Sequence, residues 1–181
     1  MAVAPRPGET LHGRNYQVIP GGKGANQAVA AARLNADIGF IACVGDDSFG
    51  INIRENFKMD GIDITGVKMQ PNCPTGIAMI QVSDSGENSI CISAEANAKL
   101  TAEAIEPDLD RIRQADYLLM QLETPMTIQR NAYTSQLRFN NLFSLSNGFT
   151  VNHKTCEQCC YTIYPLLPPV GVWTVSQFQC G

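Results

Sequence analysis

The sequence lacks a large excess of either charge and lacks any long apolar run. Its 181 residues carry a formal net charge of −4 at pH 7, which provides no electrostatic footprint for nucleic acid or an anionic membrane. No stretch approaches the roughly 18 consecutive apolar residues of a membrane span, and the first residues lack the apolar segment of a signal peptide. Hydrophobic residues make up 44% and charged residues 17%, which excludes collagen-like and largely disordered classes. We therefore expect a soluble cytoplasmic protein with no nucleic-acid or membrane partner.

Acidic residues are scarce in the C-terminal part of the chain. Residues 127–181 contain one of the 17 acids, Glu157, but 8 of the 13 aromatic residues and 4 of the 7 cysteines. This change in composition marks a boundary near Met126. The tail beyond it has three interpretations: a separate small module, a partner-binding extension, or out-of-frame sequence. We favour the last, because no helix or strand periodicity is sustained there and short apolar runs are broken by Asn, Ser and Pro.

No metal site is predicted. The tail offers soft ligands at close spacing: His153, Cys156, Cys159 and Cys160. The second ligand pair of a zinc site is missing, because only Cys180 follows. The other cysteines are dispersed in apolar or turn contexts, and we expect them to be reduced thiols: Cys43, Cys73 and Cys91.

The first 126 residues alternate between helical and strand-like segments. Residues 25–34 are Ala-rich and have high helix propensity, and Asn35 can close this helix in a left-handed conformation. Residues 38–44 form a short apolar run ended by Gly45, which predicts a buried strand.

A second helix is predicted after this strand and ends at Gly61. Its N-cap candidates are Asp46, Asp47 and Ser48. Its apolar residues fall at i, i+4 and i+8 and therefore share one face: Phe49, Ile53 and Phe57. Strands and helices that alternate through short links predict a parallel α/β sheet.

An antiparallel hairpin interrupts this pattern. Residues 77–82 and 89–93 are strand-like, and residues 83–88 form a polar turn between them. The hairpin suggests a small second sheet that projects from the main domain.

A helix and a buried strand follow the hairpin. Thr101 can cap the helix, which Pro107 breaks or restarts. Residues 117–122 then form a buried strand that delivers Glu123 to its carboxyl end, where ligands bind in open α/β sheets.

A glycine-rich loop, Gly21-Gly22-Lys23-Gly24, precedes the first helix and points to a ligand site. Free N–H groups and the helix dipole favour an anion or a polar ligand there, although the spacing fits neither a Walker A loop nor a dinucleotide fingerprint. Lys23 adds a cationic donor, Asn26 an amide that donates and accepts, and Glu123 acceptors. This mixed set suits the hydroxyl groups of a sugar. The alternative is a packing turn, with Lys23 in solvent and Glu123 at a strand edge.

The loop and the start of the helix, Gly21-Gly22-Lys23-Gly24-Ala25-Asn26-Gln27-Ala28, resemble the first signature of the ribokinase family of carbohydrate kinases. Further stretches resemble this family in the same order: Pro7-Gly8-Glu9-Thr10, Val44-Gly45-Asp46-Asp47-Ser48-Phe49-Gly50, Thr75-Gly76-Ile77-Ala78, Glu95-Ala96-Asn97-Ala98 and Leu119-Met120-Gln121-Leu122-Glu123. The resemblance covers about residues 7–126. It departs from the signature at Asn35, where the family has Gly or Ser.

The resemblance implies a ribokinase-like three-layer α/β sheet with a small β-lid over the sugar, here truncated at both ends. Residues 1–126 would be a partial domain with lid strands at about 75–93, and residues 127–181 a non-matching tail. The implied reaction is transfer of the γ-phosphate of ATP to the 5-hydroxyl of D-ribose, with Mg²⁺ and a monovalent cation such as K⁺. The implied partner is a second copy of the chain, bound through the lid.

The resemblance also implies roles for single residues. It assigns ribose contacts to Gly22, Lys23, Asn26 and Glu123, and apolar contacts to Ala78 and Ile80 of the lid. The family's late Gly-Ala-Gly-Asp motif, with the general base and the anion hole, is missing from this sequence, and its Asn-x-x-Glu segment has no convincing counterpart. The resemblance therefore assigns no catalytic or cofactor-binding residue, and we expect the chain alone to be inactive and marginally stable. A non-catalytic sugar-binding or dimerisation module and a related fructose or nucleoside kinase stay open.

Overall fold

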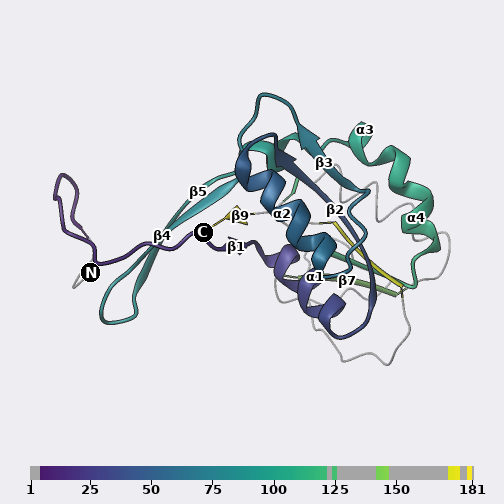
Figure 1. The fold of residues 1–181 in the computed structure, drawn as a ribbon, viewed down its shortest axis with the longest axis horizontal. Helices are drawn as coiled ribbons and strands as arrows, with labels where there is room; N and C mark the ends of the chain where they lie inside the picture. The colour runs from purple at the N-terminus through teal and green to yellow at the C-terminus, as the bar shows by residue number, and fades with distance from the viewer. Residues whose placement is uncertain (1–4, 122–123, 126–141, 147–170, 176–178, 181) are drawn as a thin grey trace, which may run out of the picture.

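The computed structural model describes residues 5–121, 124–125, 142–146, 171–175 and 179–180 (Figure 1). They form a five-stranded sheet of order β3-β2-β8-β6-β7, in which every pair is parallel, and a four-stranded sheet of order β1-β9-β4-β5.

The strands are β1 (Pro20–Gly21), β2 (Asp37–Gly45), β3 (Val67–Gln70), β4 (Ile77–Val82), β5 (Asn88–Ser93), β6 (Tyr117–Gln121), β7 (Leu142–Ser146), β8 (Gly171–Val175) and β9 (Gln179–Cys180). The helices are α1 (Lys23–Arg33), α2 (Ser48–Met59), α3 (Ala102–Ile105) and α4 (Leu109–Gln114), and the 3₁₀ turns are η1 (Glu95–Lys99) and η2 (Glu106–Asp108).

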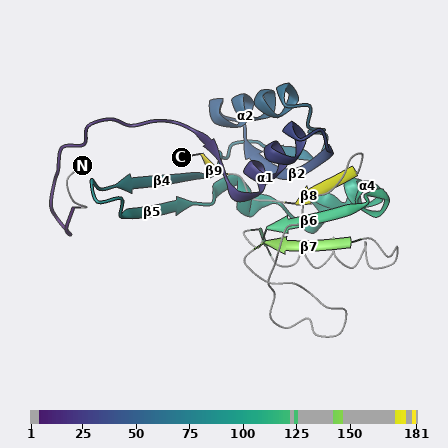
Figure 2. The ribbon, with the colours of Figure 1, turned by 90° about the horizontal axis from the view of Figure 1, so that it is seen from below.

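The α/β prediction is confirmed by a three-layer arrangement around β2, which is buried from Ile38 to Gly45. Side chains of a strand alternate between the two faces of the sheet. One face of β2 packs against α1 and α2 through Ile38, Phe40, Ala42 and Val44. The other face packs against the segment from η1 to α4 through Ile41 and Cys43. Figure 2 shows α1 and α2 together on one side of the sheet.

Helix α1 begins at Lys23, two residues before the predicted start. Gly22 acts as the N-cap with φ 102°, a conformation that a glycine adopts without strain, so the glycine loop leads directly into the helix. At the other end Asn35 has φ 65°, and the prediction that it closes the helix is confirmed.

Helix α2 has the predicted cap and stop. The Asp47 side chain accepts a hydrogen bond from the Gly50 N–H, and Gly61 follows the helix with φ 75°. Phe57 packs edge to face on Phe40, with ring centroids 5.0 Å apart. Phe49 was expected on the buried face, but it is 37% exposed, because in the first turn of α2 it is Gly50 that faces the core, against the end of β2.

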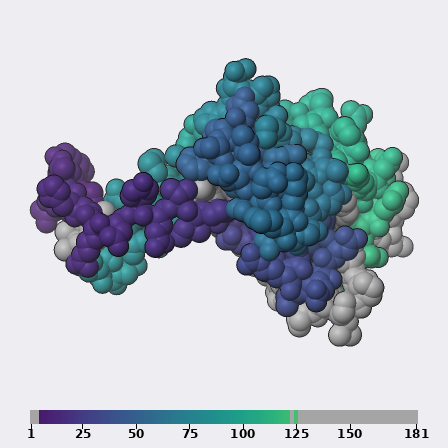
Figure 3. All heavy atoms as spheres, viewed as in Figure 1, coloured from purple at the N-terminus to yellow at the C-terminus, as the bar shows by residue number. Residues whose placement is uncertain are grey.

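The predicted hairpin is confirmed as β4 and β5, which pair antiparallel from Ile77↔Ser93 to Val82↔Asn88. It projects from the core as an arm, beside the N-terminal segment (Figures 2 and 3). Arg14 of that segment forms an ion pair of 2.8 Å with Asp84 in the hairpin turn. One face of the hairpin is apolar except for Asn88, and its apolar residues are Ala78, Ile80, Val82, Ile90 and Ile92, of which only Ala78 is buried.

Three short strands come from residues 127–181, where no periodicity was found. Strand β8 lies between β2 and β6 and runs parallel to both, and β7 pairs with the outer side of β6. Strand β9 pairs with β1 and β4 in the smaller sheet. The soft-ligand cluster of the tail lies outside the described residues. In the described part of the chain, no helix is long and apolar enough to cross a membrane.

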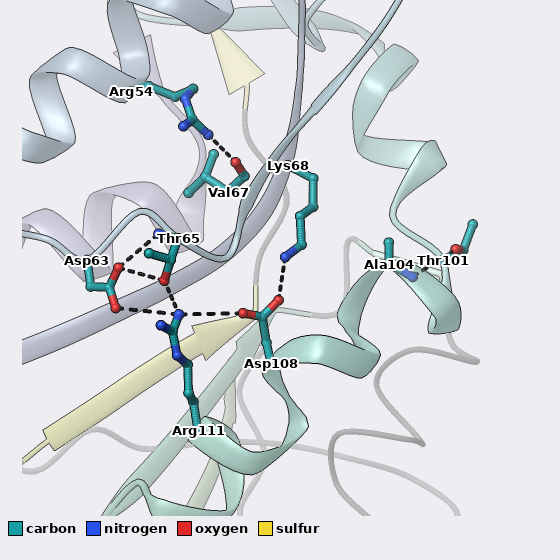
Figure 4. Close-up of polar contacts among 9 residues, drawn as sticks. All are labelled: Arg54, Asp63, Thr65, Val67, Lys68, Thr101, Ala104, Asp108 and Arg111. Carbon is teal, nitrogen blue, oxygen red and sulfur yellow. Dashed lines mark hydrogen bonds and ion pairs between the residues drawn. The ribbon is translucent and has the colours of Figure 1, made fainter.

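A polar network joins β3 to the helices after the hairpin (Figure 4). The Asp108 carboxylate, 4% exposed, lies 2.6 Å from Lys68 Nζ and 3.7 Å from Arg111 Nη1. Arg111 also donates to the Thr65 hydroxyl and lies 3.7 Å from Asp63 Oδ2. Nearby, the Thr101 hydroxyl caps α3 by accepting from the Ala104 N–H, and Pro107 separates α3 from α4, as predicted.

We predict that Asp108→Asn lowers the free energy of unfolding by about 1–3 kcal/mol, because it leaves Lys68 and Arg111 facing a buried neutral group. Chemical denaturation of the whole chain measures this loss. The matched control is Asp110→Asn, which removes the partner of Arg113 at a carboxylate that is 80% exposed and should cost less than about 0.5 kcal/mol. Equal losses in the two variants would contradict the prediction.

Cys43, Cys73 and Cys91 are free thiols in different surroundings. Burial raises the pKa of the Cys43 thiol to about 11, with a further contribution from the neighbouring Cys73, whereas Cys91 lies exposed on β5. We predict that iodoacetamide at pH 8 modifies Cys91 while Cys43 stays unmodified until the chain is unfolded, since only the thiolate reacts. Peptide mapping by mass spectrometry measures this, and equal modification of Cys43 and Cys91 in the folded chain would show that β2 is not buried.

Candidate functional site

The predicted sugar residues of the glycine loop lie at the N-terminus of α1. No side chain of the described residues caps this helix end, and its first turn holds no acidic residue. Among the described residues, no acidic side chain at this end offsets the positive end of the helix dipole, which favours an anion or an electron-rich ligand. Lys23 and Asn26 are both exposed on the first turn, and the Asn26 N–H donates to the Gly22 carbonyl over 2.9 Å.

The carboxyl end of β6 lies against the same part of α1. The Gln121 side chain, which is buried, donates a hydrogen bond from Nε2 to Gln27 Oε1. Glu123 follows Gln121 by two residues but lies outside the described residues, so its contact with the sugar stays a prediction. Sequence reasoning missed this pair of glutamines, although a polar residue at the end of the apolar run of β6 was a visible signal.

The β4–β5 hairpin is the predicted lid, and its root is the end next to the core, at Ile77 and Ser93. Strand β9 connects this root to the glycine loop. Cys180 pairs with Pro20 on one side and with Ile77 on the other. Because neighbouring strands are about 4.8 Å apart, the backbones of Pro20 and Ile77 are roughly 10 Å apart. Ala78 is thus held at the root of the lid, close to the loop, whereas Ile80 lies farther out and is half exposed.

The structure therefore brings together most but not all of the predicted site. Gly22, Lys23 and Asn26 share one helix end, and Ala78 lies at the adjoining root of the lid. Exposed Lys and Asn side chains next to backbone donors can bind a polyhydroxylated ligand, since hydroxyl groups both donate and accept.

A hollow of about 470 Å³ lies between α1 and α2. Of the predicted sugar residues, only Asn26 lines it, together with residues of α2 such as Asn56 and Phe57. The hollow therefore does not coincide with the predicted site. Within the described ranges, no group of three or more His, Cys, Asp or Glu side chains is placed to hold a metal ion.

Known proteins match this chain in sequence and in fold. The family model described as pfkB family carbohydrate kinase matches residues 2–134. The ribokinase of Haemophilus influenzae is 50% identical over 167 residues, which cover 84% of this chain and 55% of that protein. The ribokinase of Schizosaccharomyces pombe is 42% identical over 130 residues, which cover 68% of this chain and 41% of the relative.

A solved structure of Arabidopsis thaliana ribokinase, complexed with ribose and ATP, matches with a TM-score of 0.70 and 30% sequence identity. The match covers 80% of this chain and 47% of that chain. This chain spans about half the length of the curated relatives it matches.

The match to the family covers well over half of the chain and continues past Met126 into the first residues of the tail. The ordered motifs, the three-layer sheet and the projecting hairpin agree with it. This chain belongs to the pfkB family of carbohydrate kinases.

Proposed function

We propose that this chain is the sugar-binding part of a ribokinase-type enzyme, which transfers the γ-phosphate of ATP to the 5-hydroxyl of D-ribose. The observation that carries the proposal is the meeting of three elements: the N-terminus of α1, the root of the lid, and the carboxyl end of β6. The similarity to ribokinases at up to 50% identity supports ribose as the sugar.

In this proposal each predicted residue has a defined task. Gly22 lets the backbone approach the sugar closely because it has no side chain, and its φ of 102° would strain any other residue. Lys23 donates to ribose hydroxyls, Asn26 donates and accepts, and Glu123 accepts. Ala78 and Ile80 cover an apolar face of the sugar and exclude water.

Phosphoryl transfer needs the reactants to be positioned and the phosphate charge to be neutralised. In this proposal the chain positions the sugar and supplies no group that neutralises the phosphate. The complex of the Arabidopsis enzyme with ATP supports ATP as the donor. Mg²⁺ would neutralise phosphate charge and K⁺ would activate, but the described residues include no cluster suited to a metal ion, so we assign neither ion to a residue. We also propose a cytoplasmic location, which the free thiols of Cys43, Cys73 and Cys91 support.

The apolar face of the hairpin supports a second part of the proposal, a homodimer formed through the lid. Ile80, Val82, Ile90 and Ile92 are each about half exposed on this face. Burying them against a second copy would remove apolar surface from water, which is the main favourable term in association.

We predict that Asn26→Ala weakens D-ribose binding by roughly tenfold, because the variant loses hydrogen bonds with the sugar. Isothermal titration of the whole chain with ribose measures this. Asn56→Ala is the matched control, since Asn56 lies on α2 across the hollow from Asn26 and outside the predicted site. A folded chain that gives no binding signal with ribose would contradict the proposal, and tighter binding of fructose or adenosine would favour the related kinases.

ADP release with ATP, Mg²⁺, K⁺ and ribose separates the sugar-binding part from a complete enzyme. We expect no ribose-dependent turnover by this chain alone. Turnover would show that residues outside those assigned above supply a general base.

We predict that Ile90→Lys weakens the lid dimer at least tenfold, because it places a charge in an apolar contact. Sedimentation equilibrium measures the dissociation constant. Leu34→Lys is the control, since Leu34 is also an exposed apolar residue, 79% exposed against 53% for Ile90, but lies at the end of α1. A purely monomeric parent chain at high concentration would exclude the dimer.

A further inference from the structure

One carboxylate ties the root of the lid to the core. Asp47 Oδ1 accepts from the Gly50 N–H over 2.9 Å and from the Thr75 hydroxyl over 2.6 Å, and Oδ2 accepts from the Thr75 N–H over 2.8 Å. Thr75 is 1% exposed, and its hydroxyl oxygen accepts in turn from the Gly45 N–H over 3.0 Å. The end of β2, the start of α2 and the approach to β4 are therefore joined at one point.

This carboxylate does more than cap a helix. An N-cap needs one side-chain oxygen for the amide of N2 or N3, and the bond to Gly50 alone supplies it. The other contacts of the carboxylate hold the segment that leads into the lid: the Thr75 N–H donates to Oδ2 and the Thr75 hydroxyl to Oδ1. Thr75 precedes Ala78, the buried lid residue of the predicted sugar site, by only three positions.

The charge of Asp47 strengthens these bonds. Burial acts to raise the pKa of this carboxyl, but hydrogen bonds from the Thr75 hydroxyl and from backbone N–H groups outweigh it and hold the pKa below its ordinary value. Asp47 is therefore ionised at neutral pH, and hydrogen bonds to an ionised acceptor are shorter and stronger than neutral ones.

The backbone segments around Asp47 and Thr75 pack closely, which leaves the root of the lid little room to move. A Cβ on Gly45 would lie 2.2 Å from the Cys73 carbonyl oxygen, and one on Gly50 would lie 2.1 Å from the Gly45 carbonyl oxygen. The chain is also held where it returns to the core after β5, because a Cβ on Gly76 would lie 2.7 Å from the Ala94 carbonyl oxygen. Both ends of the lid thus leave the core from fixed positions.

We propose that Asp47 and Thr75 are positioning residues that set the direction in which the lid leaves the core, and thereby place Ala78 and Ile80 over the sugar. The part about the sugar rests on the function proposed above. How firmly the lid is held to the core can be measured without any sugar, so the two ideas can fail separately.

Hydrogen–deuterium exchange of the whole chain, read by mass spectrometry, tests the proposal. The test variants are Asp47→Asn, which keeps a good N-cap but turns one acceptor into a donor, and Thr75→Val, which keeps the shape but loses the hydroxyl. The matched controls are Asp46→Asn, whose carboxylate accepts only from the Asn72 N–H among its described contacts, and Thr75→Ser, which keeps the hydroxyl. Ribose titration of each variant is the second measurement.

We expect exchange in residues 77–82 and 89–93 to become roughly tenfold faster in both test variants, while exchange in residues 38–44 stays within about twofold of the parent; Gly45 is left out of this reference region because its N–H donates to the Thr75 hydroxyl. The controls should match the parent in both regions. The test variants should also bind ribose roughly tenfold more weakly.

Unchanged exchange in the hairpin would overturn the proposal. An equal increase in the hairpin and in β2 would also overturn it, because Asp47 would then stabilise the whole fold. Faster hairpin exchange with unchanged ribose affinity would disprove the link to the sugar. If the parent chain does not bind ribose, the proposed function fails, and hairpin exchange alone decides whether Asp47 and Thr75 position the lid.

Discussion

The burial of β2 on both of its faces is the constraint from which the other layers follow. Its alternate side chains form the centre of two separate hydrophobic clusters, one with α1 and α2 and one with the segment from η1 to α4. A strand buried on both sides requires cover on both sides, and in a parallel sheet this cover comes from crossover connections. The same strand ends at Gly45, where it positions α2 and the root of the lid.

The candidate site lies where the core of the five-stranded sheet meets the exposed β4–β5 hairpin. The core fixes the start of α1 through the Gln27–Gln121 contact, and it fixes the lid through Asp47 and Thr75. Beyond this root the hairpin has few buried side chains and the structure has no described layer over its apolar face. A rigid base with an exposed arm is the arrangement that lets a lid cover a small ligand without disturbing the sheet.

Much of the fold could be predicted from the sequence because local signals agreed with one another. The cap at Asp47, the left-handed Asn35 and the break at Pro107 all lie where residue chemistry placed them. The site was harder to predict, because the Gln27–Gln121 contact joins residues that are far apart in the chain. Strands β7 to β9 escaped prediction because they are only two to five residues long, in a part of the chain where the apolar runs are short and broken by Asn, Ser and Pro.

The position of β8 has a consequence for biosynthesis. The strand pairs residue 171 with residue 37 and lies between β2 and β6, two strands made much earlier. While the chain is being synthesised, these two strands lack their central neighbour until residue 175 has been added. Pairings between residues so distant in the chain close slowly, and unpaired strand edges are prone to associate with other chains in the interval. A nascent chain of this protein therefore exposes the edges of β2 and β6 to association with other chains for longer than the formation of its helices and its hairpin would require.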